Sequence, residues 1–107
     1  MMKVYFSSNK MEKKLNKAKA EFGERKGKTL LIRYDELCAA KNLKDLYGLK
    51  QLNLHPLIGE DSGSYAITTI EPFRMIITPY NEDGAPISDQ PEDITSIMIT
   101  NLDINYH

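Results

Sequence analysis

The spacing of apolar residues changes character about halfway along this chain. Over residues 9–23 and again over residues 28–40, apolar side chains recur at steps of three and four, so each set lies on one face of a helix. The first stripe consists of Met11, Leu15, Ala18 and Phe22, and the second of Leu30, Tyr34, Leu37 and Cys38. Gly27 separates the two predicted helices. From residue 54 onward the apolar residues alternate or form short runs, which is typical of strands.

Five stretches have the composition and alternation of strands. They cover residues 3–7, 54–58, 64–70, 73–80 and 94–106. Pro56 excludes its stretch from a central position in a sheet, because proline cannot donate a ladder hydrogen bond. The apolar run Met75–Ile77 indicates a central strand that is buried on both faces. The expected fold class is α+β in the order β-α-α-β-β-β, with an N-terminal strand, one additional short strand, and a helical hairpin packed on a mostly antiparallel sheet.

The size of the chain favours one domain. Its 107 residues suffice for a single hydrophobic core, so we expect one domain over residues 1–107. Cys38 is the only cysteine, which excludes an internal disulfide, and its place on an apolar stripe indicates a small core residue rather than a nucleophile. No apolar run approaches the roughly 20 residues of a membrane span, and the first apolar stretch is too short for a secretory signal. These features favour a cytoplasmic protein with no membrane partner.

The net charge of −1 hides a strong asymmetry between the two halves. Residues 1–56 carry 13 Lys and Arg against 6 Asp and Glu, whereas residues 57–107 carry only Arg74 against 9 Asp and Glu. Lysine runs usually form a solvated helix face. The alternative is a basic surface that meets RNA phosphates or an acidic partner.

Spacings that would indicate a metal or cofactor site are missing from the sequence. His55 and His107 are 52 positions apart, and neither a CxxC nor an HExxH pattern occurs. Gly59 and Gly63 lie between two predicted strands, whereas a phosphate-binding glycine loop leads into a helix. We therefore expect neither a metal nor a cofactor.

Four residues do suggest a chemistry. Tyr106 and His107 follow the alternating apolar residues that end at Ile104, where they cannot extend a core, and His55 and Arg74 lie in other predicted strands. Metal-independent RNA cleavage needs a base for the ribose 2′-hydroxyl, a cation for the phosphate and an acid for the leaving 5′ oxygen. Histidine suits both proton roles near neutral pH, and the planar guanidinium of arginine matches phosphate geometry.

Each of these residues also has a structural interpretation. Arg74 could form an ion pair with Glu71 or Asp103. His55 could be a half-buried residue before proline, and Tyr106 an edge aromatic or part of a frayed chain end.

Several short motifs, in this order and spacing, resemble the RelE/ParE toxin superfamily, in particular its HigB-like branch of host-growth-inhibition toxins. The resemblance covers nearly the whole chain. Its motifs are Val4-Tyr5-Phe6-Ser7-Ser8, Leu54-His55-Pro56-Leu57-x-Gly59, Gly63-x-Tyr65-Ala66-Ile67, Pro72-x-Arg74-x-Ile76 and the final Tyr106-His107.

The resemblance implies the toxin of a type II toxin–antitoxin pair, a ribosome-dependent mRNA endonuclease held inactive by a helix-turn-helix antitoxin. DNA would be contacted only indirectly, through the antitoxin. Arg74 would stabilise the scissile phosphate, His55 and His107 would orient the RNA and move protons, and Tyr106 would stack on or position a base. The RNA-binding residues that we expect are Asn105, Tyr65, Lys13 and Lys17.

Two positions depart from the family pattern. Asn105 stands where relatives commonly have Asp or Glu, and Ile58 stands where many have Lys. Asn105 can hydrogen-bond RNA but cannot act as a base, and Ile58 removes one phosphate contact. The alternative function is therefore a catalytically weak or inactive toxin-fold protein that binds its antitoxin in autoregulation. Gyrase inhibition, as in the ParE branch, is disfavoured because it needs no paired proton donors.

Overall fold

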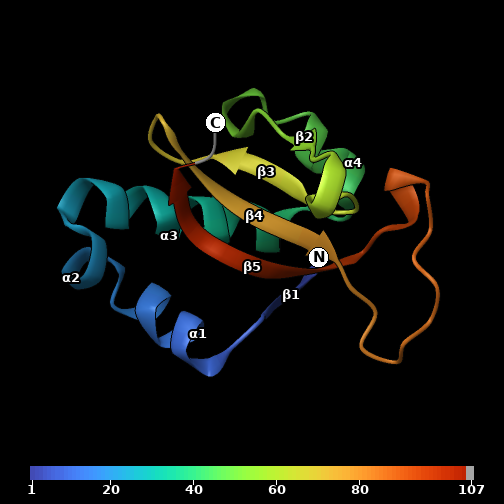
Figure 1. The fold of residues 1–107 in the computed structure, drawn as a ribbon, viewed down its shortest axis with the longest axis horizontal. Helices are drawn as coiled ribbons and strands as arrows, with labels where there is room; N and C mark the ends of the chain where they lie inside the picture. Colours follow the sequence, from blue (N-terminus) through green and yellow to red (C-terminus); the bar gives the residue numbers. More distant parts are fainter. Residues whose placement is uncertain (106–107) are drawn as a thin grey trace.

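The computed structural model describes residues 1–105, so the predicted site residues Tyr106 and His107 lie outside the described part of the chain. The fold is α+β, as the sequence predicts, and Figure 1 shows its course. In chain order the elements are β1 (Lys3–Phe6), α1 (Asn9–Asn16), α2 (Ala18–Phe22), α3 (Glu24–Ala39), α4 (Leu43–Tyr47), the 3-10 turn η1 (Lys50–Leu52), β2 (His55–Pro56), η2 (Gly59–Asp61), β3 (Tyr65–Thr68), β4 (Phe73–Pro79), η3 (Pro91–Asp93) and β5 (Ser96–Asn105).

The strands form one sheet in the order β1-β5-β4-β3-β2. β1 runs parallel to β5, and the other three pairings are antiparallel. As expected from Pro56, β2 is a two-residue strand at an edge of the sheet. β1 pairs with only the first part of β5, from Ser96 to Ile99, so the later part of β5 has a strand neighbour on the β4 side alone.

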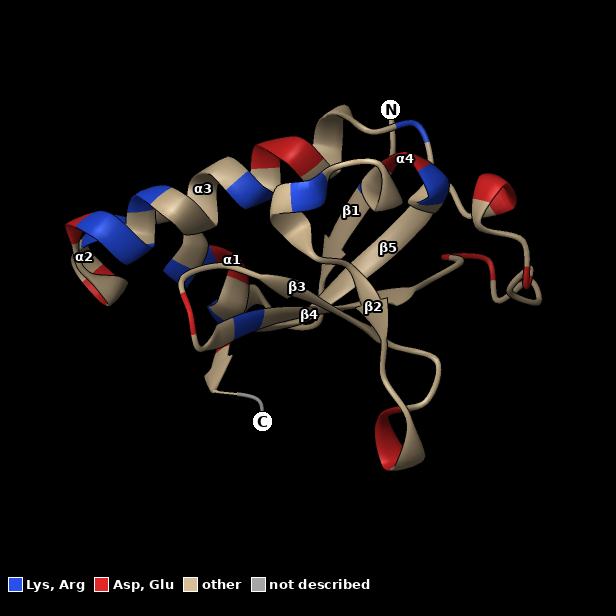
Figure 2. Ribbon diagram, turned by 90° about the horizontal axis from the view of Figure 1, so that it is seen from above, with Lys and Arg blue, Asp and Glu red and all other residues tan. Residues whose placement is uncertain are grey.

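The two faces of the sheet differ in what covers them. α3 and α4 lie along one face, where most of the buried apolar residues form a single core (Figure 2). β4 contributes Met75 and Ile77 to this core, whereas Ile76 between them points to the other face. There it joins a small apolar cluster with Leu57, Ala66 and Ile104. The prediction of a strand buried on both faces is therefore confirmed.

The helical region differs from the prediction in two respects. The first predicted helix is divided into α1 and α2 at Lys17, whose φ of −114° and ψ of 35° leave the helical region. Gly27, expected to separate two helices, instead lies buried inside α3. A Cβ at Gly27 would stand 2.5 Å from the Lys19 Cα, so the absence of a side chain lets α2 pack directly against α3.

A membrane span would need a long apolar helix, and residues 1–105 contain none.

Candidate functional site

The strand register places His55 on the face of the sheet that α3 and α4 do not cover. This is the open face of the sheet. His55 pairs with Ala66, which in turn pairs with Ile76, so the three residues form one row across β2, β3 and β4. The His55 side chain is half-buried, and its Nδ1 lies 2.9 Å from the carbonyl oxygen of Asn53. Because a carbonyl oxygen can only accept, Nδ1 donates the hydrogen, and within residues 1–105 Nε2 has no hydrogen-bond partner.

Arg74 lies on the same face two residues before Ile76 along β4. Its side chain is only 16% exposed, and Nη1 donates to the carbonyl oxygen of Phe73 at 3.0 Å. Nη2 donates to Glu71 Oε2 at 3.2 Å. Of the two ion pairs considered for Arg74 from the sequence, the one with Glu71 is therefore present. These two hydrogen bonds fix the guanidinium, and its remaining N–H groups can donate to a further acceptor.

The strand register also gives the separation of His55 and Arg74 along the sheet. Two strand spacings and two residues of rise put their Cα atoms about 12 Å apart. A group the size of a phosphodiester, bound to Arg74, would occupy the space between them.

The last described residues of β5 lie beside Arg74. Asn105 is exposed and pairs with Phe73, the residue before Arg74, while Ile104 pairs with Arg74 itself. The roles expected of Tyr106 and His107 concern residues outside the described part of the chain and stay predictions.

A shallow hollow of about 210 Å³ lies on the open face, and neither Arg74 nor His55 is among its lining residues. Its lining consists of Leu57, Asp61, Ile76, Thr100, Asn101 and Ile104. Asn101 Oδ1 accepts a hydrogen bond from the Asp103 backbone N–H at 3.1 Å, so Nδ2 remains as a donor. Sequence reasoning did not single out Asn101, although an amide that interrupts the apolar pattern of the last strand was an available signal.

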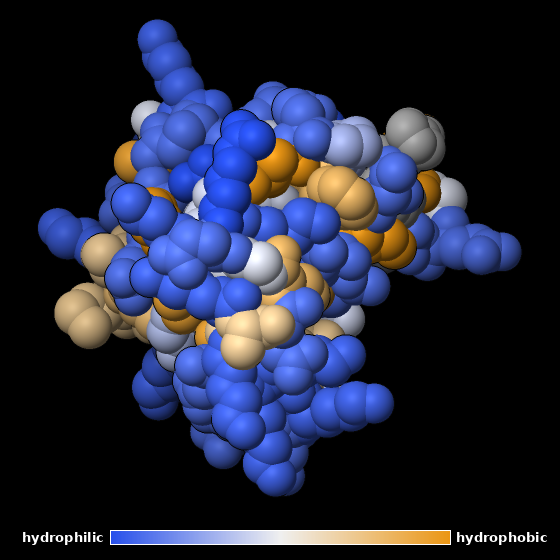
Figure 3. All heavy atoms as spheres, turned by 90° about the vertical axis from the view of Figure 1, so that its left-hand side faces the viewer, coloured by the Kyte–Doolittle hydropathy of each residue, from blue (hydrophilic) through white to orange (hydrophobic). Residues whose placement is uncertain are grey.

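The positive charge of the N-terminal half is gathered in space on the helical side of the molecule. Figure 2 shows Lys and Arg along α1 to α3, with Asp and Glu between them, whereas η2, η3 and the loop before η3 carry Asp and Glu alone. The end of the molecule formed by α1 and α2 presents a largely hydrophilic surface (Figure 3). Lys13 and Lys17 are exposed there and are available to a partner.

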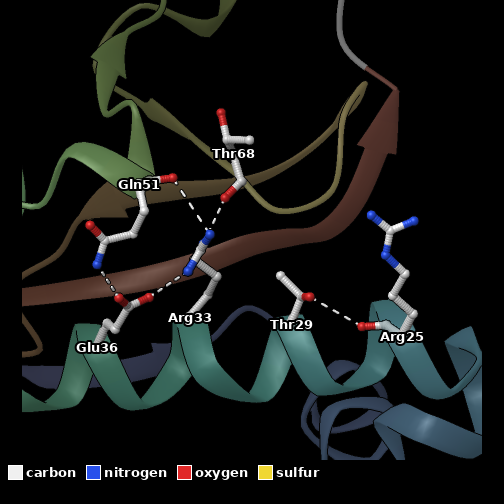
Figure 4. A network of polar contacts seen from close by, with 6 residues as sticks. All are labelled: Arg25, Thr29, Arg33, Glu36, Gln51 and Thr68. Carbon is white, nitrogen blue, oxygen red and sulfur yellow. Dashed lines mark hydrogen bonds and ion pairs between the residues drawn. The ribbon is translucent and has the colours of Figure 1, made fainter.

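Two basic residues of α3 have structural partners instead. Lys26 Nζ lies 3.2 Å from Asp103 Oδ2 and 3.4 Å from the centre of the Phe73 ring. Asp103, the other ion-pair partner considered for Arg74, is therefore bound to Lys26. Arg33 joins α3 to the sheet, since its Nε donates to the Thr68 carbonyl at 2.8 Å (Figure 4).

Arg33 also donates to Glu36 Oε1 at 2.7 Å, and Glu36 in turn accepts from Gln51 (Figure 4). This network ties α3 to both η1 and the end of β3. It thereby fixes Thr68, the residue of β3 that pairs with Arg74.

Tyr65 is not brought to this face. It packs against the main core, and its ring meets that of Tyr47 edge to face at 6.4 Å. Its expected contact with RNA stays a prediction. The Tyr65 side chain lies on the opposite face of the sheet from His55.

Cys38 is half-buried rather than fully buried. A hydrogen bond with its side chain, together with burial, raises the pKa of Tyr34 to about 12.

Larger hollows lie elsewhere, between Tyr5 and Glu82 and between α3 and α4, and neither is lined by His55 or Arg74. Within residues 1–105, no group of three or more His, Cys, Asp or Glu side chains is arranged to hold a metal ion.

Comparisons of the chain with protein-family models, with curated proteins and with solved structures each found no match. What the site can do must therefore be judged from its own residues.

Proposed function

We propose that this protein is a metal-independent endoribonuclease that cleaves mRNA on the ribosome, acting as the toxin of a type II toxin–antitoxin pair. The supporting observation is the sheet register, which gathers Arg74, His55 and the strand that leads to Tyr106 and His107 at one end of an open face. A guanidinium held by Glu71 and the Phe73 carbonyl suits a phosphodiester, and a shallow hollow lined by Ile76 and Ile104 on the same face suits an unstacked base.

In the proposed reaction Arg74 binds the scissile phosphate and stabilises the charge that develops on its oxygens. The ribose 2′-oxygen attacks the phosphorus, the bond to the 5′ oxygen breaks, and the products are a 2′,3′-cyclic phosphate and a free 5′-hydroxyl. His55 and His107 orient the RNA and move protons, and Tyr106 positions a base. Asn105 is exposed and pairs with Phe73 at the end of β5, where its amide would hydrogen-bond RNA from the edge of the sheet.

The partners that we propose follow from the charge distribution and from the family resemblance. Lys13 and Lys17 would contact ribosomal RNA phosphates from the exposed helical side. A helix-turn-helix antitoxin would hold the protein inactive and would link it indirectly to DNA. The site of action would be the cytoplasm, where ribosomes translate.

The test is induced expression in a bacterium with transcript ends mapped, using the native chain, Arg74→Ala and Arg25→Ala. Arg25 is an exposed arginine on α3 (Figure 4), so its loss changes the net charge equally but leaves the site intact. We expect cleavage within translated codons for the native chain and for Arg25→Ala. In Arg74→Ala cleavage should fall by about 10²- to 10³-fold, as on removal of a preorganised donor.

Intact transcripts and normal growth with the native chain would refute the nuclease. The alternative would then stand, namely a toxin-fold protein that binds its antitoxin without cleaving RNA.

A further inference from the structure

The tight connection between β3 and β4 holds a carboxylate directly beside Arg74. Glu71 Oε2 accepts from Arg74 Nη2 at 3.2 Å. Main-chain hydrogen bonds fix this turn, since Phe73 N donates to the Ile70 carbonyl at 2.7 Å and Thr69 N donates to the Phe73 carbonyl at 3.2 Å. The position of the Glu71 backbone relative to Arg74 is therefore set by the hairpin.

The two partners of this ion pair are very differently exposed. The Arg74 side chain is 16% exposed, whereas that of Glu71 is 70% exposed. Within residues 1–105, Oε1 of Glu71 has no hydrogen-bond partner. Pairs with one partner so open to water add little to fold stability. The carboxylate thus lies beside the phosphate-binding group, with one oxygen available to a ligand.

The geometry of phosphoryl transfer places a condition on the group that takes the first proton. The attacking 2′-hydroxyl is bonded to the carbon next to the one that carries the phosphate, so its base must lie beside the group that binds that phosphate. Glu71 satisfies this condition by direct contact with Arg74. Along β4, Arg74 lies between the turn that carries Glu71 and the row that contains His55.

We infer that Glu71 is the general base of the proposed ribonuclease, and this inference rests on the proposed function. The Glu71 carboxylate takes the proton of the 2′-hydroxyl as the bond from the 2′ oxygen to phosphorus forms. His55, protonated at Nε2 and held through Nδ1 by Asn53, gives a proton to the 5′ oxygen as its bond to phosphorus breaks. One proton is taken up and one is released, and exchange with water restores both groups.

The test compares the native chain with Glu71→Gln and with Glu92→Gln. Glutamine keeps the size of glutamate and an oxygen that can accept from Arg74, but it cannot take a proton at neutral pH. Glu92 is an exposed glutamate on η3, so its replacement changes the net charge equally but away from Arg74. Far-UV circular dichroism checks that each variant is folded.

Single-turnover cleavage of a short message on purified ribosomes gives the rate. Binding is measured with a single-stranded oligoribonucleotide that carries one 2′-deoxy residue at the cleavage point, so that it cannot react. We expect Glu71→Gln to lower the rate by about 10²- to 10⁴-fold while binding stays equal or becomes tighter, because one negative charge beside the phosphate is lost. Glu92→Gln should behave as the native chain does.

A native rate in Glu71→Gln would overturn the inference and leave the ribonuclease in place. A faster rate would overturn it as well and would show that Glu71 merely occupies Arg74 in the free protein. Loss of rate and binding together would mean that Glu71 only positions Arg74. A native chain that cleaves nothing would refute both the function and the base.

Discussion

Replacing Gly27 by alanine tests the packing of the helical layer, because helix propensity and tertiary packing predict opposite signs for this change. By helix propensity alone, Gly→Ala inside a helix should stabilise the protein by about 1 kcal/mol. In the structure the new Cβ would stand 2.5 Å from both the Cα and the N of Lys19 and 2.6 Å from the carbonyl carbon of Ala18. All three are main-chain atoms, so no rotamer change relieves the overlap.

The magnitude follows from how far α2 must move. An ordinary contact begins at 3.4 Å, so the backbone near Lys19 would have to withdraw by roughly 0.9 Å. Overpacking of this kind costs about 1–3 kcal/mol, and a displacement of main chain belongs in the upper part of that range. After the gain in propensity is subtracted, we expect Gly27→Ala to lower the free energy of unfolding by about 1–2 kcal/mol.

Urea unfolding followed by far-UV circular dichroism measures this difference, with Lys28→Ala as the control. Lys28 is exposed on the same helix, so its replacement should change the free energy of unfolding by less than about 0.5 kcal/mol. Thermal unfolding of Gly27→Ala should occur roughly 5–10 °C below that of the native chain. An unfolding midpoint above the native value would refute the close approach of α2 to α3 at Gly27.

Two further predictions concern the site and the alkaline stability of the protein. Ile58, 87% exposed beside Leu57 of the hollow, should gain a phosphate contact when replaced by lysine. The salt slope for binding a single-stranded oligonucleotide should then steepen by about 0.7, while Ile58→Gln leaves it unchanged; equal slopes for both variants would exclude Ile58 from the RNA path. The pKa of Tyr34 is raised to about 12 in the folded protein, so the unfolded phenol ionises first and stability is lost as pH rises from about 10 to about 12. Tyr34→Phe should remove most of the fall in urea midpoint between about pH 9 and about pH 11, and a fall as large as in the native chain would contradict this cause.

The sequence by itself indicated where helices and where strands prevail, and several of their positions. The helical stripes, the buried run Met75–Ile77 and the edge position of Pro56 all follow from rules that act over a few residues. The side-chain period of a helix or a strand is a local property. A pattern of apolar residues therefore reveals it without knowledge of the partner that covers them.

Only the tertiary structure decided which segments meet. The parallel pairing of β1 with β5 joins residues more than 90 positions apart, and the choice of Glu71 rather than Asp103 as the partner of Arg74 depends on the β3–β4 turn and on Lys26. Which segments pair depends on the packing energy of the whole core, and a local sequence pattern does not contain that information. For the same reason the sequence indicated a break between helices at Gly27, whereas in the fold Gly27 lies within α3 where α2 packs against it.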